Sequence, residues 1–89
     1  MEFAKSLSGH DRNQIYLIKE KDEKFVYLVN GTTKVLASPK KKSAKHIQII
    51  KNVPINVTDI LSEEFTDISI KRAVKTYRKL IESSKQEDF

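Results

Sequence analysis

The sequence predicts a mostly β protein: a small antiparallel barrel of about five strands, followed by a C-terminal helical extension. Short runs rich in Ile, Val, Tyr and Phe recur up to residue 50, and turn signals separate them, which is typical of such a barrel. After residue 57 the apolar residues recur at helical spacing instead. Because 89 residues allow one domain, we expect the barrel over 1–51, a linker over 52–57 and the helical extension over 58–89.

Five apolar runs are the expected strands. In two of them, QIYLI and FVYLV, both alternating sets of side chains are apolar, so each strand should face a core on one side and another element on the other. The fifth run, HIQII, alternates, which predicts that Ile47 and Ile49 point inward and that His46 and Gln48 point outward. The five expected strands cover residues 3–6, 14–20, 25–29, 32–37 and 46–50.

Turn signals join these runs. Asn30-Gly31 predicts a type I′ hairpin, because both residues tolerate the positive φ that this turn requires. A second tight connection is expected at Lys21-Asp22-Glu23, so the second, third and fourth strands should form an antiparallel meander. Ser38-Pro39 should end the fourth strand, since proline has no amide hydrogen to donate to a neighbouring strand.

Two helices are expected after the linker, which contains Pro54. Thr58 is a candidate N-cap for a short helix over about 59–65, on which Leu61 and Phe65 share one face. A longer helix over about 69–83 can begin at either of two capping residues, Asp67 or Ser69.

The longer helix carries an apolar stripe with spacings of four, three and four residues: Ile70, Val74, Tyr77 and Ile81. Such a stripe must pack against something. One interpretation is that the helix docks on the barrel. The other is that it binds a partner protein or a second copy of the chain.

The net charge of +5 is concentrated in one segment. Residues 38–51 contain five lysines and no acidic residue, whereas the preceding residues carry a net charge of +1 and the following ones −1. A local excess of one sign attracts polyanions. Lysines in the expected loop between two strands can therefore contact several phosphates of one nucleic-acid backbone. The alternative is that this lysine-rich turn is simply a solvated loop.

Other function classes are disfavoured. The absence of cysteine excludes disulfides and thiol chemistry, and with two glycines neither a P-loop nor a dinucleotide fingerprint can be written. His10 and His46 fall in separate expected loops, and the adjacent Glu63 and Glu64 would point about 100° apart on a helix. We therefore expect neither an enzyme nor a bound metal or cofactor. No apolar run reaches the length of a signal peptide or membrane span, so we expect a cytoplasmic protein without a membrane partner.

Over residues 3–50 the chain resembles the small bacterial KOW-domain RNA-binding proteins, which are related to a KOW ribosomal protein of the archaeal and eukaryotic large subunit. Three motifs in order carry this resemblance: the loop Ser6 with Ser8–Asn13, the hairpin Tyr27–Gly31, and the basic ending Pro39–Lys42 with Lys45–Ile47. Asn13 replaces a loop glycine of the family, a tolerable change because asparagine accepts positive φ. Residues 52–89 have no counterpart in the family.

The resemblance implies an SH3-like barrel that holds structured RNA, most directly ribosomal RNA, and thus a ribosome-associated role in translation. It assigns Gly9 and Asn13 to shaping the first loop. It assigns six residues to RNA contact: Arg12, Lys40, Lys41, Lys42, Lys45 and His46. A rival hypothesis is a protein interaction module of the transcription or translation machinery. In that case the apolar stripe of the long helix binds a neighbouring protein, such as a ribosomal protein, and the lysines meet an acidic partner.

Overall fold

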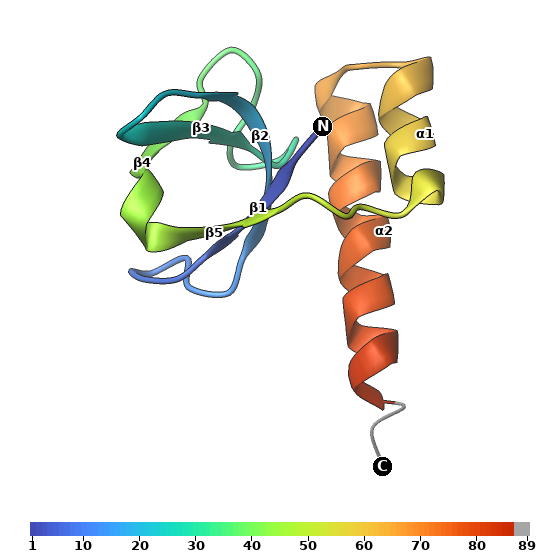
Figure 1. The fold of residues 1–89 in the computed structure, drawn as a ribbon. Coiled ribbons are helices and arrows are strands. Elements are labelled where there is room, and N and C mark those ends of the chain that lie inside the picture. Colours follow the sequence, from blue (N-terminus) through green and yellow to red (C-terminus); the bar gives the residue numbers. More distant parts are fainter. Residues whose placement is uncertain (87–89) are drawn as a thin grey trace.

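A computed structural model of the chain describes residues 1–86, so residues 87–89 of the predicted extension lie outside the described part. It contains a five-stranded antiparallel sheet with two helices packed beside it (Figure 1). The strands are β1 Phe3–Ser6, β2 Ile15–Lys21, β3 Phe25–Val29, β4 Lys40–Ser43 and β5 Ile47–Ile50, with a 3-10 turn, η1 Ala44–His46, before β5. The helices are α1 Ile55–Glu63 and α2 Asp67–Gln86.

The sheet has the strand order β4-β3-β2-β1-β5, in which each neighbouring pair is antiparallel. It curls (Figure 1), but its two edge strands, β4 and β5, are not paired with each other, so the expected closed barrel is not what forms. The expectation of a mostly β chain is also corrected, because helices of nine and twenty residues accompany strands of four to seven residues. The chain is a mixed sheet-and-helix domain.

Both faces of the sheet carry an apolar core, as the doubly apolar runs predict. Phe3, Ile15 and Leu17 face the helices and join a cluster with residues of α1 and α2. Tyr16 and Leu28 belong to the other cluster, within the curl of the sheet. Successive side chains of a strand point to opposite faces, so one short sheet supports two packed layers.

Helix α2 docks on the sheet through the predicted apolar stripe. Ile70 and Val74 are buried in the core, and Tyr77 and Ile81 pack against it. The ring of Tyr77 meets that of Phe3 edge-on, with centroids 5.4 Å apart. Burying each large aliphatic side chain contributes roughly 1.5–3 kcal/mol, so this contact is a main source of stability. Of the two interpretations of the stripe, the structure has the intramolecular one.

The segment after β3 differs from the prediction. Among the described residues Gly31 has a positive φ of 79° but Asn30 does not, so no type I′ hairpin forms. Residues 32–37 are not a strand, and among them only Val35 forms a bridge, to Ser38. Instead, the Leu36 amide donates to the Asp67 carboxylate at 2.8 Å. This tertiary contact with the start of α2 holds the segment as a loop.

The fourth strand forms later, in the lysine run itself. β4 pairs with β3, with Lys40 opposite Leu28 and Ser43 opposite Phe25. Pro39 therefore precedes the strand instead of ending it, a position where its missing amide hydrogen costs little. The predicted basic loop is thus mostly an edge strand, and this changes where its side chains point.

Both helices begin earlier than expected. α1 starts at Ile55 within the expected linker, and Thr58 lies inside it, where its hydroxyl donates to the Ile55 carbonyl. The cap of α2 is Thr66, which exchanges hydrogen bonds with Ser69: each backbone amide donates to the other's hydroxyl oxygen. This reciprocal pairing satisfies two amides of the first turn. Within residues 1–86, neither helix combines the length and apolar character needed to cross a bilayer.

Phe65 and Ile49 are exposed, although each was expected to share a face with a residue that is buried. Phe65 lies just after α1 and is 46% exposed, whereas Leu61 of the same expected face is buried. Ile49 is 38% exposed because it lies on the edge strand β5, opposite the small residue Ala4. Ile47, two residues earlier, is buried as predicted.

Candidate nucleic-acid interface

The alternation of β4 separates its three lysines. Lys40 and Lys42 point to one face of the strand and Lys41 to the other. Lys40 and Lys42 reach the carboxylate of Asp11, and the distance from Nζ to the carboxylate oxygen is 2.8 Å for each. The Lys42 side chain is only 10% exposed and also donates to the Ser8 carbonyl at 2.9 Å. Lys40 and Lys42 therefore hold the loop between β1 and β2 against β4.

Asp11 is the centre of this network. Besides the two ammonium groups, it accepts hydrogen bonds from the hydroxyls of Ser6 and Tyr16, both at 3.0 Å. Burial raises the pKa of the Asp11 carboxyl, but these four hydrogen bonds lower it more and hold it well below its usual value of 3.8. The carboxylate is therefore charged at neutral pH and offsets part of the lysine charge.

Two residues of the loop between β1 and β2 have a positive φ. Gly9 has φ 84° and Asn13 has φ 72°, both in the left-handed region. The Asn13 amide donates to the Ser6 carbonyl and closes the loop, and the Leu7 amide donates to the His46 carbonyl at 2.8 Å. The loop is thereby joined to η1 as well as to β4.

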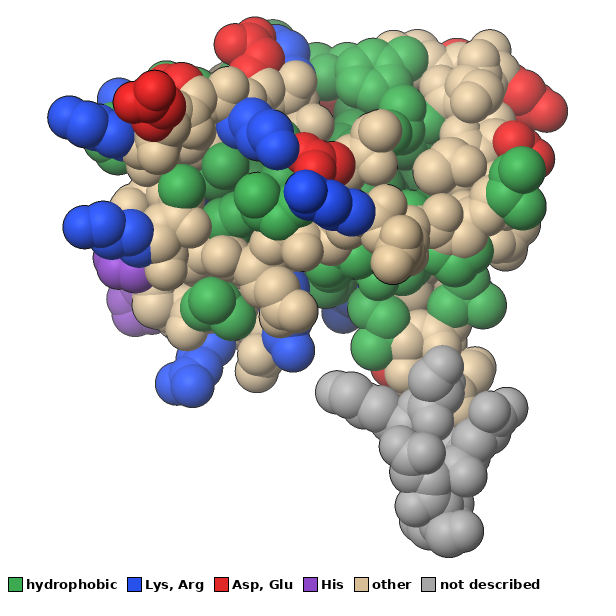
Figure 2. Space-filling view, viewed as in Figure 1, with side chains coloured by type: hydrophobic (Ala, Val, Ile, Leu, Met, Phe, Trp, Pro, Cys, Tyr) green, Lys and Arg blue, Asp and Glu red, His purple; other side chains and the backbone are tan. Residues whose placement is uncertain are grey.

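Four of the six residues assigned to RNA contact are exposed: Arg12, Lys41, Lys45 and His46. We call these four the basic surface. Lys41 lies over the Phe25 ring, with Nζ 4.1 Å from the centroid, and shares a shallow hollow with Asp22 and Glu23. Figure 2 shows Lys and Arg (blue) and His (purple) side chains standing out at the side of the sheet away from the helices. The four side chains come from the first loop, β4 and η1, which hydrogen bonds join to one another, and Lys41 points to the face of β4 away from the loop.

Sequence reasoning grouped Lys40 and Lys42 with the exposed lysines and missed Asp11. The segment 38–51 contains no acid, so its counter-charge comes from a residue far earlier in the chain. The signal available was the position of Asp11 between two residues that tolerate positive φ, which predicts a folded loop rather than a solvated one. Among residues 1–86, no group of three or more His, Asp or Glu side chains is arranged to hold a metal ion.

Tyr16 offers a spectroscopic test of this network. Burial, together with the hydrogen bond to Asp11 and its charge, raises the pKa of Tyr16 to about 12 from an ordinary value of 10.0. The stabilisation this gives is complete below about pH 10 and is lost as the pH rises through 12. In a titration followed by absorbance at 295 nm, with folding monitored by circular dichroism, Tyr16→Phe should remove the component near pH 12. An unchanged late component in that variant would contradict the assignment.

No protein-family model matches this chain, and a search of curated proteins finds no match. The relation to KOW-domain proteins therefore rests on the motifs of residues 3–50 and is a proposal.

Proposed function

We propose that this protein binds structured RNA through the basic surface, as a KOW-related, ribosome-associated module. One observation carries the proposal: Asp11 and its two lysine partners fix the loop and strand from which the basic surface projects. When the backbone that carries the cations is already ordered, binding costs only the rotamer freedom of the charged side chains themselves. Phosphates of an RNA backbone are a ligand class that suits such a surface.

The mechanism assigns different tasks to the two sets of lysines. Lys41 and Lys45, with Arg12, release counterions by facing phosphates, and His46 adds a hydrogen-bond donor beside them. Lys40 and Lys42 hold the frame and contact phosphate little, because Asp11 already occupies their ammonium groups. The ring of Phe25 beside this surface is covered by Lys41 and is not free to stack on a base. The protein would therefore recognise the backbone and the shape of the RNA rather than its bases.

The KOW relation is supported by the order of the three motifs and by the left-handed backbone at Gly9 and Asn13. Under this relation the curled sheet is an SH3-like fold, and the first loop and the basic segment Pro39–Ile47 face the RNA. The rival hypothesis, a partner-binding stripe on α2, is not proposed, because Ile70 and Val74 are buried in the core and Tyr77 and Ile81 pack against it.

The test is the salt dependence of RNA binding. A variant carrying Arg12→Gln, Lys41→Gln and Lys45→Gln should bind a fluorescently labelled RNA hairpin more weakly. The slope of log affinity against log salt should become shallower by about 2 to 3, since three phosphate contacts contribute about 0.7–0.9 each. Fluorescence anisotropy at several salt concentrations measures both quantities.

The matched control is Lys19→Gln, Lys51→Gln and Arg72→Gln, which removes the same charge from exposed positions elsewhere. A control slope equal to that of the unmodified protein supports local contact. Equal slopes in all three proteins would show that the basic surface does not bind RNA. Crosslinking in cells, followed by sequencing of the attached RNA, then tests the ribosomal assignment: recovery of messenger or transfer RNA alone would reject it.

A further inference from the structure

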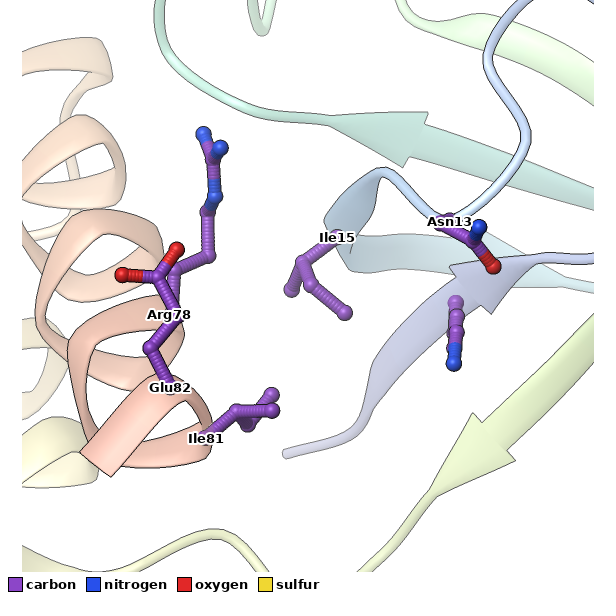
Figure 3. Close-up of a pocket in the computed structure, with 6 residues that line it drawn as sticks. Asn13, Ile15, Arg78, Ile81 and Glu82 are labelled. Atoms are coloured by element: carbon purple, nitrogen blue, oxygen red, sulfur yellow. The ribbon is translucent and has the colours of Figure 1, made fainter. Parts of the chain in front are cut away.

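A second basic region lies on the opposite side of the first loop, between α2 and the sheet. A groove of about 280 Å³ separates the C-terminal half of the helix from the paired residues Lys5 and Ile15 of β1 and β2. Figure 3 shows Asn13 and Ile15 on the sheet side and Arg78, Ile81 and Glu82 on the helix side of this groove. The groove exists because α2 is long and its last turns run past the end of the sheet (Figure 1).

The groove continues toward the start of α2. A neighbouring hollow of about 240 Å³ shares Ile15 and Arg78 with it and adds Lys71 and Lys75. Lys71, Lys75 and Arg78 are spaced four and three residues apart, so they lie along one side of the helix. Seven residues at about 1.5 Å each give this row a length of about 10 Å. Phosphates recur every ~3.4 Å along the axis of a nucleic-acid strand, so the row can face more than one of them.

The charges of this region are nearly all positive. Lys5, Lys71, Lys75 and Arg78 line it, and Glu82 is the one acidic residue among the described lining residues. All ion pairs found within residues 1–86 lie elsewhere, at Lys21–Glu2 and around Asp11. The positive charge of this region is therefore directed at a ligand or at solvent.

The sheet side of the groove combines Lys5 with neutral hydrogen-bonding side chains. Asn13 and Gln14 supply side-chain amides, whereas the side chains of Asn30 and Thr32 beside them are already hydrogen-bonded within their own loop. Such groups bond to sugar hydroxyls, phosphate oxygens and base edges. The apolar residues at the bottom, Ile15 and Val74, are buried and Ile81 is half-buried, so the groove offers little apolar surface to a lipid bilayer. A row of cations on the helix wall, with one lysine and two neutral amides on the sheet side, suits a nucleic-acid strand.

We propose that this groove is a second RNA contact surface, in which Lys71, Lys75 and Arg78 face the phosphates of one strand and the amides of the first loop face its sugars. The inference rests on the proposed function and extends it. The loop from Leu7 to Gln14 carries Arg12 of the basic surface and also lines this groove through Asn13 and Gln14. One bound RNA therefore contacts both sides of the same loop.

The test uses the full chain carrying Lys71→Gln, Lys75→Gln and Arg78→Gln. All three residues are exposed and glutamine has a similar helix propensity, so the fold should persist, as a thermal melt checks. The expected result with the labelled RNA hairpin is a loss of at least about tenfold in affinity at 0.1 M salt and a slope shallower by about 2 to 3. The Lys19, Lys51 and Arg72 variant is again the charge-matched control.

The outcomes separate this inference from the proposed function. Suppose that the unmodified protein binds the hairpin and that the basic-surface variant binds it more weakly. If the groove variant then binds as well as the control variant, the groove is not an RNA contact surface, whereas the proposed role of the basic surface is retained. If the unmodified protein does not bind the hairpin, both fail. If the groove variant loses binding to polyglutamate but keeps its RNA affinity, the groove serves an acidic protein and the inference is overturned.

Discussion

Gly31→Ala should destabilise the protein by about 3 kcal/mol or more, combining the cost of a left-handed alanine with that of overpacking. Gly31 has φ 79° and passes directly under the first turn of α2. A Cβ at this position would lie 2.2 Å from the Asp67 carbonyl oxygen and 2.6 Å from the Lys71 amide nitrogen. Both are backbone atoms, so α2 would have to move away from the sheet. Urea unfolding followed by circular dichroism measures the loss.

Gly9→Ala is the matched control, because Gly9 has a similar φ of 84° but open surroundings. Its added Cβ would meet Asp11 Oδ1 at 3.6 Å and Lys42 Nζ at 3.8 Å, which are ordinary contacts. We expect a loss of about 1–2 kcal/mol, from the backbone conformation alone. Equal losses in the two variants would show that close packing beneath α2 is not what requires Gly31.

Asp11→Asn should cost about 2 to 3 kcal/mol, because it leaves two partly buried ammonium groups without their counter-charge. The Asp11 side chain is 12% exposed and that of Lys42 10%, so water compensates little, whereas Lys40 at 29% recovers some hydration. Urea unfolding followed by circular dichroism measures this loss. Asp59→Asn, at an exposed position of α1, is the control and should leave stability unchanged.

Acid should reproduce part of this effect in the unmodified protein. The folded pKa of Asp11 lies below its ordinary value of 3.8, so its contribution is complete above that pH and falls as the pH drops through the folded value. Asp11→Asn should lack this part of the acid dependence. Adding Lys42→Gln to Asp11→Asn should recover some stability, because the double variant no longer has the unpaired ammonium group of Lys42. An acid profile identical in the two proteins would contradict the network.

Local signals predicted the parts of the fold that local contacts determine. The runs of β1, β2, β3 and β5 and the turn at Asp22 are found where expected, because β-branched and aromatic residues in a half-buried sheet outweigh alternatives. The stripe of α2 was also identified with its docking interpretation. Its expected N-cap was wrong, because Thr66 and Ser69 pair with each other across the first turn.

Distant contacts determined what the sequence did not predict. Asn30-Gly31 resembles a hairpin turn, yet Gly31 is required by an approach of α2 that no local pattern reveals. The strand over 32–37 was wrong for the same reason, since the start of α2 binds the Leu36 amide. In the candidate site, the exposure of Lys41 and Lys45 could be anticipated, but the roles of Lys40 and Lys42 depend on a carboxylate from another loop.

The contact between Phe3 and Tyr77 has a consequence for the order of events during synthesis. It joins the first strand to the middle of α2, and the core around it also contains Val57, Leu61 and Ile70. While the ribosome has released only the strands, Phe3, Leu17 and Val29 have no helix to cover them. Cooperative folding therefore waits until α2 has emerged. Until then the nascent sheet exposes apolar surface to chaperones, and the chain acquires its finished basic surface as a late, single step.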